Sequence, residues 1–277
     1  MKNILVTTDF SEKSKAGLRF AIQLASQHTC NLTFFHAYHL LIPASLDHAK
    51  IETYQKAEAK KIQITLNLFV EKIYSGMNIV AAHRKCIIKN TVLPQSSIIE
   101  YAAKNHFDFI CISTRGAGKL ERFFGTNTAN IISYSAVPVI AVPYNYKSKT
   151  ITSILYASDL VNLERELKKV VGFAKPLKAK VELLHFTSPL EKMFDLKTVE
   201  MVVKKLSKYN IKLNIKNSNF MQGLLSKIEA AITKTKPSMI IMFTEQNRTL
   251  FQKLFFSSNS AAYSYHPKIP LLVFNKS

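Results

Sequence analysis

Small and hydroxyl-bearing residues gather after an apolar run in the first half of the chain. They are Ser113, Thr114, Gly116, Gly118, Gly125, Thr126 and Asn127. Glycine tolerates positive φ and lets backbone N–H groups come close to a phosphate. Because Gly125, Thr126 and Asn127 open a predicted helix, free N–H groups and the positive end of the helix dipole would face an anion there. The segment predicts an anion-binding loop, and the alternative is that Thr126 or Asn127 merely caps the helix.

An acidic residue follows the first apolar run of the chain. Residues 3–8 end at Thr8, and Asp9 and Ser11 come next, where either can cap a helix predicted over residues 11–27. In open parallel sheets, ligands bind beyond the carboxyl ends of the strands, where the strand order reverses. We expect Asp9 and the loop over residues 113–118 to lie at that edge.

Strands and helices alternate through the first half. The predicted strands are residues 3–8, 32–38, 82–89, 109–113 and 137–142, and the predicted helices are residues 11–27, 47–76, 94–105 and 126–135. Such nearly apolar strands need helices on both faces and right-handed crossovers between parallel strands. We therefore predict an α/β fold in which each half is a Rossmann-like, five-stranded parallel sheet with helices on both faces.

The second half repeats the first. Residues 3–10 match residues 153–160, residues 31–38 match residues 180–186, and residues 107–142 match residues 238–274. Self-similarity on this scale indicates duplicated domains rather than a solenoid. The chain length suits two domains, which we place at residues 1–146 and 150–277, joined by a short polar linker.

The two copies differ where a ligand would bind. Gly125 is replaced by Ser257, and neither Gly116 nor Gly118 has a glycine counterpart. The loss of these glycines removes the easiest way to cradle a phosphate. Asp159 is retained, but capping the helix that follows it would explain this without a ligand. We predict a degenerate site in the second half.

The basic charge of the chain is diffuse. Lys and Arg exceed Asp and Glu by 38 − 18 = +20, made up of 18 − 9 = +9 as far as Lys149 and 20 − 9 = +11 beyond it. A nucleic-acid surface should gather such charge in a stripe or patch, and no short block of this sequence does so. We expect a basic surface whose main ligand is not nucleic acid.

The cysteines and the hydropathy of the chain favour a location in the cytoplasm. Cys30, Cys86 and Cys111 form no Cys-x-x-Cys pair and no cluster with metal-ligand spacing, so we interpret them as core thiols of a reducing compartment. No stretch of about 18 consecutive apolar residues occurs. We expect a cytoplasmic protein that does not enter a membrane.

Other motif interpretations have less support. The segment 116–121 lacks the third glycine of a dinucleotide fingerprint and the Gly-Lys-Ser/Thr end of a P-loop. His36 and His39 are three residues apart at a strand end, where side chains alternate in direction, so we interpret them as packing or surface residues and predict no metal site. No base accompanies Ser11 or Ser113 in a recognisable order, so we assign no catalytic residue.

At these positions the chain resembles the universal stress protein family. The resemblance rests on residues 6–11 and on the loop Ser113-x-x-Gly116 … Gly125-Thr126-Asn127, and it covers the whole chain, twice. In that family a loop of the form Gly-x-x-Gly, nine residues, then Gly-Ser or Gly-Thr wraps the phosphates and ribose of ATP, while an Asp after the first strand contacts the adenine side. Here Ser113 replaces the first glycine, and eight residues separate Gly116 from Gly125.

The resemblance implies an adenine nucleotide alpha-hydrolase-like fold and a site for ATP, with or without Mg²⁺, formed by Thr8, Asp9, Ala37 and the loop residues named above. Gly118 could take up the missing loop residue, or the site could hold a diphosphate or nothing. The implied function is a stress-response protein that binds ATP in its first half and signals occupancy to an unknown protein partner. An interaction or scaffold module with both sites closed is the alternative. Slow ATP hydrolysis is a third, although nothing in the sequence looks like a water-activating base.

Members of this family commonly pair through their last strands. Two fused copies would satisfy that pairing inside one chain across residues 137–142 and 269–274, which would hide two strand edges. We expect an internal pseudo-dimer, and a further homodimer stays open.

Overall fold

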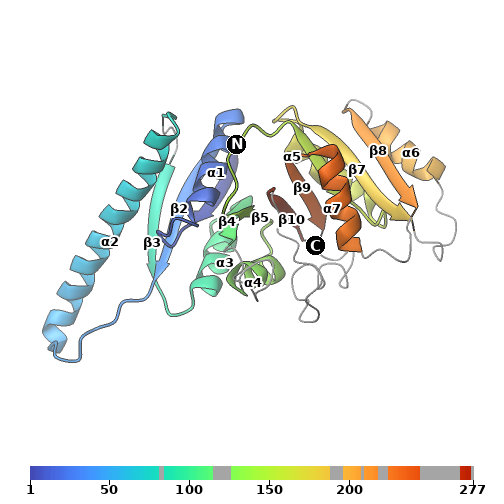
Figure 1. Ribbon diagram of the computed structural model, residues 1–277. Helices are drawn as coiled ribbons and strands as arrows, with labels where there is room; N and C mark the ends of the chain where they lie inside the picture. The colour runs from blue at the N-terminus through green and yellow to red at the C-terminus, as the bar shows by residue number, and fades with distance from the viewer. Residues whose placement is uncertain are drawn as a thin grey trace. The chain divides into compact units, whose positions relative to one another are not determined.

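The computed structural model describes residues 1–80, 84–114, 126–187, 196–206, 209–217, 224–243 and 269–275. The chain forms two compact units, and within the described residues unit 1 ends at Ser148 and unit 2 begins at Lys149. Each unit alternates strands with helices along the chain (Figure 1). The expected pairing of the two halves through their last strands stays a prediction.

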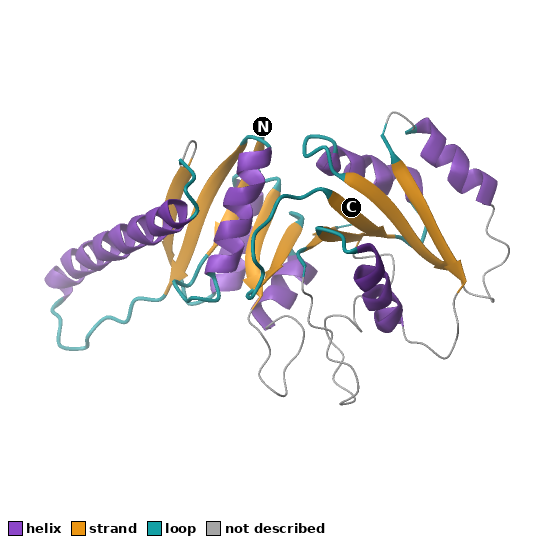
Figure 2. Ribbon diagram, turned by 45° about the horizontal axis from the view of Figure 1, so that its top comes forward, coloured by secondary structure: helices purple, strands orange, loops and turns teal. Residues whose placement is uncertain are grey.

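Unit 1 is a doubly wound α/β domain. Its elements are β1 (Lys2–Thr7), α1 (Lys15–Gln27), β2 (Cys30–Tyr38), α2 (His48–Gly76), β3 (Arg84–Asn90), α3 (Pro94–Lys104), β4 (Phe109–Thr114), α4 (Thr126–Tyr134) and β5 (Val139–Pro143). The strands are all parallel, in the order β3-β2-β1-β4-β5. Helices α1 and α2 pack together, as do α3 and α4, and the two pairs cover opposite faces of the sheet (Figure 2).

Unit 2 repeats this architecture. Its described elements are β6 (Ser153–Ala157), α5 (Leu163–Ala174), β7 (Lys180–Thr187), α6 (Leu196–Lys205), β8 (Ile211–Asn217), α7 (Leu224–Thr235), β9 (Met239–Phe243) and β10 (Leu271–Phe274). The strands are again parallel, in the order β10-β9-β6-β7-β8. Together the two units confirm the predicted α/β fold with five-stranded parallel sheets.

The cores lie along the central strands. Leu5, Val6 and Ile110 in unit 1, and Leu155 and Ile241 in unit 2, are fully buried. Strands that are covered by helices on both faces have no solvent-facing side, so their sequences are apolar at successive positions rather than at alternate ones. This burial explains why the strands can be recognised in the sequence as apolar runs.

Several element boundaries differ from the predictions by one or more residues, and two of these differences have a local explanation. Helix α1 begins at Lys15, not near Ser11, and β5 begins at Val139, two residues later than predicted. The backbone N–H of Val137 donates to Ser135 Oγ at 3.0 Å, and Pro138 has no N–H to give. Neither residue can therefore donate a ladder hydrogen bond at the start of this strand.

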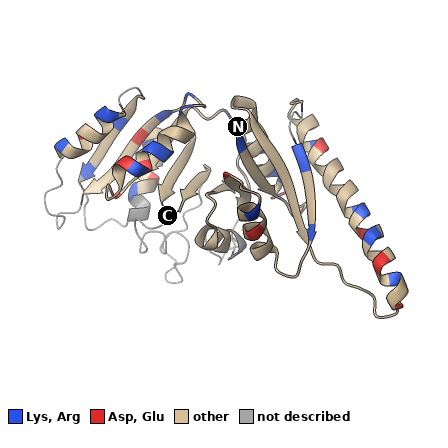
Figure 3. Cartoon of the chain, turned by 180° about the vertical axis from the view of Figure 1, so that it is seen from behind, with Lys and Arg blue, Asp and Glu red and all other residues tan. Residues whose placement is uncertain are grey.

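Lysine and glutamate side chains form ion pairs on the surface of α2. Along α2, Lys56 pairs with Glu52 and Lys61 pairs with Glu58, each at 2.6 Å, and Figure 3 shows the two signs alternating on this helix. Exposed pairs of this kind contribute little stability and mark a solvated face. Within the described part of the chain, no helix is both long and apolar enough to span a membrane.

Candidate functional site

The carboxyl ends of β1 and β4 lie together where the strand order of unit 1 reverses. From β1 the chain continues to β2 and β3 on one side, and from β4 it continues to β5 on the other. These two strands are parallel neighbours, with Val6 opposite Cys111. Open α/β sheets bind ligands beyond such a switch point. The predicted site residues lie here, because Thr8 follows β1 and Thr114 ends β4.

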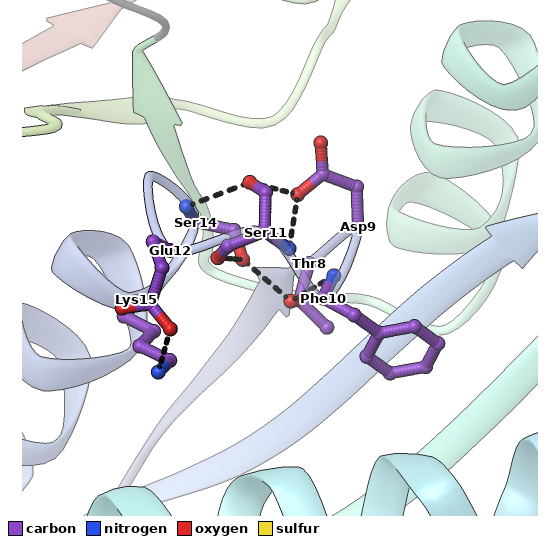
Figure 4. Close-up of polar contacts among 7 residues, drawn as sticks. All are labelled: Thr8, Asp9, Phe10, Ser11, Glu12, Ser14 and Lys15. Carbon is purple, nitrogen blue, oxygen red and sulfur yellow. Dashed lines mark hydrogen bonds and ion pairs between the residues drawn. The ribbon is translucent and has the colours of Figure 1, made fainter.

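A hydrogen-bonded turn carries Thr8 and Asp9 out of β1 (Figure 4). Thr8 Oγ1 accepts the backbone N–H of Phe10 at 3.1 Å and lies 2.9 Å from Ser14 Oγ. Asp9 Oδ1 accepts both the backbone N–H of Ser11, at 3.0 Å, and its hydroxyl, at 2.5 Å. Asp9 is exposed, and its other carboxylate oxygen points away from the turn in Figure 4. The turn therefore presents an oriented carboxylate at the carboxyl edge of the sheet.

Phe10 has an unusual backbone conformation. Its φ is 63°, in the left-handed region that non-glycine residues rarely adopt. The N–H bond to Thr8 Oγ1 supports this conformation, and the ring packs against His36, with centroids 4.0 Å apart, and against Phe69 at 5.6 Å. Side-chain packing therefore holds a turn that the backbone alone disfavours.

His36 holds the same turn from β2. Its Nδ1 lies 2.8 Å from the carbonyl oxygen of Thr8. A carbonyl only accepts, so Nδ1 carries the hydrogen. Burial lowers the pKa of His36, against the opposing effects of the Thr8 hydrogen bond and the charge of Asp9. The ring is therefore neutral at pH 7, and its role agrees with the packing interpretation of this histidine.

Ser113 faces helix α1. Its Oγ accepts the backbone N–H of Gly17 at 2.6 Å and donates to the carbonyl oxygen of Ser14 at 3.0 Å. Gly17 is the third residue of α1, whose N–H has no partner inside the helix. The predicted cap from Asp9 or Ser11 does not lie at the start of α1: Ser11 Oγ accepts the N–H of Ser14 at 3.2 Å in the turn before the helix, and Ser113 bonds to the N–H of Gly17 in its first turn.

The structure brings part of the predicted site together. Thr8 and Asp9 directly follow β1, Ser113 and Thr114 end the neighbouring strand β4, and Ala37 lies near the end of β2, opposite Lys89 of β3. Gly116, Gly118 and Gly125 lie outside the described residues. Thr126 and Asn127 begin α4, but their side chains are not among those described. The role of all ten residues in binding a ligand stays a prediction.

Unit 2 contains the same turn. Ser158 Oγ accepts the N–H of Leu160 at 3.0 Å, Leu160 has φ 66°, and His185 Nδ1 lies 2.9 Å from the carbonyl oxygen of Ser158. Asp159 Oδ1 accepts the N–H of Val161 at 3.0 Å. Since α5 begins later, at Leu163, the expectation that Asp159 caps this helix is wrong. The duplication thus extends to individual hydrogen bonds.

Aromatic side chains occupy the matching edge of unit 2. By strand register, Phe243 of β9 takes the place that Ser113 has in β4. Its ring stacks on Phe274 with centroids 5.1 Å apart and meets the edge of the Tyr156 ring at 5.9 Å. Tyr156 also donates its hydroxyl to the buried carboxylate of Glu166. Ser158 Oγ donates to the Tyr156 hydroxyl at 2.9 Å, so this aromatic cluster adjoins the turn.

Sequence reasoning missed several residues of the two edges. The partners Gly17, Ser14 and His36 act through contacts between elements that are distant in the sequence, so no local pattern marks them. The aromatic residues of unit 2 were visible in the repeat, since Phe243 aligns with Ser113 once the strands are superimposed. The difference in size between Ser113 and Phe243 was the sequence signal for this feature. Among the described residues, no group of three His, Cys, Asp or Glu side chains could hold a metal ion.

Solved structures with the same architecture cover almost the whole chain. A universal stress protein from Archaeoglobus fulgidus DSM 4304 has 17% identity, covers 99% of this chain and 98% of its own, and has a TM-score of 0.69. A protein from Pseudomonas aeruginosa UCBPP-PA14 has 14% identity, covers 99% and 93%, and has a TM-score of 0.57. At these identities the likeness shows the fold alone.

A universal stress protein in complex with cAMP matches 51% of this chain and 96% of its own, with 18% identity and a TM-score of 0.34. That likeness is too weak to bear on the ligand of this chain. No curated protein matches the sequence. The model of the universal stress protein family matches residues 1–143, which is more than half of the 277 residues. The chain belongs to the universal stress protein family.

Proposed function

We propose that unit 1 binds an adenine nucleotide, ATP, at the carboxyl edge between β1 and β4, and that unit 2 binds none. The observation that carries this proposal is a contrast between two copies of one edge. Both units hold the same turn, but unit 1 has the small Ser113 beside it, whereas unit 2 has the stacked rings of Phe243 and Phe274. A phosphate needs space and backbone N–H groups, and unit 2 also lacks the glycines that would bring such groups close.

The described residues of unit 1 suit the adenosine part of such a ligand. The exposed carboxylate of Asp9 can accept hydrogen bonds from a ribose hydroxyl or an adenine amino group. Ala37, whose side chain is a single methyl group, lies near the end of β2. The first N–H groups of α4, from Thr126, have no partner inside the helix, and phosphates bind well to such groups. Mg²⁺ would enter with the nucleotide, because it is commonly held by phosphates and few protein ligands.

The departure of Ser113 from the family pattern does not oppose this proposal. Its hydroxyl is turned to α1, where it bonds to Gly17 and Ser14. A Cβ at Gly17 would lie 2.9 Å from Ser113 Oγ, so the two positions have complementary sizes. Ser113 stands where the family pattern has a glycine, but its side chain contacts helix α1 rather than entering the ligand space.

The proposed output is a stress response in which nucleotide occupancy changes how the protein meets a partner. The test is calorimetric titration of Mg·ATP into the wild type and into Gly125→Ser, which introduces the residue of unit 2. Gly76→Ser is a matched control, because a Cβ there meets no atom within 4 Å. We expect binding to the wild type and the control, and its loss in Gly125→Ser. No binding to the wild type would contradict the proposal and favour an interaction module.

A further inference from the structure

We infer that His36 is a positioning residue for the nucleotide site, because its Nδ1–H bond to the Thr8 carbonyl fixes the turn that presents Asp9. The inference rests on the proposed function and adds to it a residue that does not touch the ligand. It concerns a side chain on β2 that acts on the chain leaving β1.

The His36–Thr8 hydrogen bond takes the place of a backbone hydrogen bond of the sheet where β1 ends. Strands β1 and β2 pair in parallel as far as Thr7 and Phe35, and the N–H of Thr8 still donates to the Phe35 carbonyl at 3.0 Å. The Thr8 carbonyl instead accepts from the imidazole of His36 at 2.8 Å. At this position the donor is a side chain of β2 rather than its backbone. The chain is therefore free to turn at Asp9 without leaving the Thr8 carbonyl unpaired.

The ring of His36 is itself held in place. It packs against Phe10, with centroids 4.0 Å apart, and lies parallel to the Tyr38 ring, with centroids 6.2 Å apart and planes 6° apart. Phe10 is the residue whose φ of 63° reverses the chain after Asp9. One imidazole thus contacts both sides of Asp9 in the sequence, through its nitrogen to Thr8 and through its face to Phe10. Loss of the ring would release both neighbours together.

Unit 2 supplies an internal control for this inference. His185 makes the equivalent bond to the Ser158 carbonyl, at 2.9 Å, beside a turn that also contains an aspartate. The residue matching Phe10 is Leu160, so the bond is present there without the aromatic stack. Because the proposed function places no nucleotide in unit 2, loss of the His185 bond should affect stability but not nucleotide affinity.

The experiment measures Mg·ATP affinity and thermal stability for the full chain and three variants. His36→Phe keeps a ring but removes the donor, His36→Asn keeps a donor close to the position of Nδ1, and His185→Phe removes the equivalent donor in unit 2. We expect His36→Phe to weaken binding about tenfold, equivalent to about 1.4 kcal/mol, and His36→Asn to restore most of it. His185→Phe should lose comparable stability and bind ATP as the wild type does.

Two results would overturn the inference. One is unchanged affinity in His36→Phe, and the other is equal loss of affinity in His36→Phe and His185→Phe, which would indicate a general effect of stability. NMR gives a readout that does not need the ligand. The Nδ1 of His36 should carry its hydrogen, and the amides of Asp9 and Phe10 should shift in His36→Phe but not in His185→Phe. If the wild type binds no ATP, the proposed function fails, and unchanged amides would separately overturn the positioning role.

Discussion

The hydroxyl oxygen of Ser113 lies 2.6 Å from the backbone nitrogen of Gly17, and this contact joins the end of β4 to the first turn of α1. The two residues are 96 positions apart in the sequence. Ser14, the residue at the N-cap position, makes no side-chain cap of its own. The strand that leads into the predicted phosphate loop therefore caps the helix that follows the Asp9 turn. The Ser113 hydroxyl thus connects β4, on one side of the switch point, to the helix that follows β1, on the other.

Replacing this cap should lower stability by a small, measurable amount. Ser113→Ala removes the acceptor for Gly17 N–H and the donor to the Ser14 carbonyl, and we expect a loss of about 1 to 2 kcal/mol in the free energy of unfolding. Ser26→Ala, on the exposed side of the same helix, is the control, with an expected change within about 0.5 kcal/mol. Urea unfolding measures both. Equal effects would show that Ser113 is not the cap.

The cost of a larger residue at position 17 should depend on the residue at position 113, in addition to the hydrogen bond between Gly17 and Ser113. A Cβ at Gly17 would lie 2.9 Å from Ser113 Oγ and 3.1 Å from its backbone nitrogen, so Gly17→Ala should cost about 1 to 3 kcal/mol. In the Ser113→Gly background the nearest of these atoms is gone, and the cost of the alanine should fall. A double-mutant cycle gives the coupling energy. Strictly additive effects would argue against the contact.

The pH dependence of stability should carry a contribution from His36. Burial lowers its pKa from the ordinary value of 6.5, so the unfolded chain binds more protons than the native chain between the two values. The contribution is complete above 6.5 and is lost as the pH falls through the lowered pKa of the native state. Urea unfolding at about pH 8 and about pH 5 should show a smaller loss in His36→Asn than in the wild type. Parallel pH profiles for the two proteins would contradict this.

The aromatic edge of unit 2 should be important for stability. Phe243 is 4% exposed and contacts both Tyr156 and Phe274. Phe243→Ser introduces the residue found at this place in unit 1, and we expect it to cost about 3 kcal/mol or more, because it leaves a cavity among buried rings. Phe243→Leu, which keeps more of the volume, should cost less. A serine variant as stable as the wild type would show that the rings do not fill this edge.

The three thiols should differ in reactivity in the native protein. Burial raises the pKa of Cys30 to about 11 and raises the pKa of Cys111 further, while Cys86 is only half-buried and its pKa is also raised by burial. Thiolates react with iodoacetamide and thiols do not, so all three should be slow, in the order Cys86, Cys30, Cys111. Mass spectrometry of timed digests gives the order. Early modification of Cys111 would contradict its burial.

The sequence allowed the fold to be predicted because its signals are local. Apolar strands of the kind seen around Leu5 and Ile110, separated by helical segments, restrict the chain to a covered parallel sheet. The start of α1 could not be predicted in the same way. The hydroxyls of Thr8, Ser11 and Ser14 bond to nearby groups and delay the helix. Its true cap comes from a distant strand, which no window of sequence contains.

The candidate site was only partly accessible to sequence reasoning. Asp9 could be placed because it follows a strand, and the prediction of a degenerate site in unit 2 rests on the missing glycines of its sequence. The pairing of His36 with the Thr8 carbonyl depends on strand register, and so does the placement of Phe243 at the position of Ser113. Register follows from the sheet as a whole rather than from a motif.

The most direct test of the central claim uses the matched aspartates of the two turns. Mg·ATP is titrated calorimetrically into the wild type, Asp9→Ala and Asp159→Ala. The account predicts one nucleotide per chain in the wild type, the same binding in Asp159→Ala, and at least about tenfold weaker binding in Asp9→Ala, since a hydrogen bond to a charged group contributes about 1.5 to 3 kcal/mol. Binding that survives in Asp9→Ala and is lost in Asp159→Ala would contradict it.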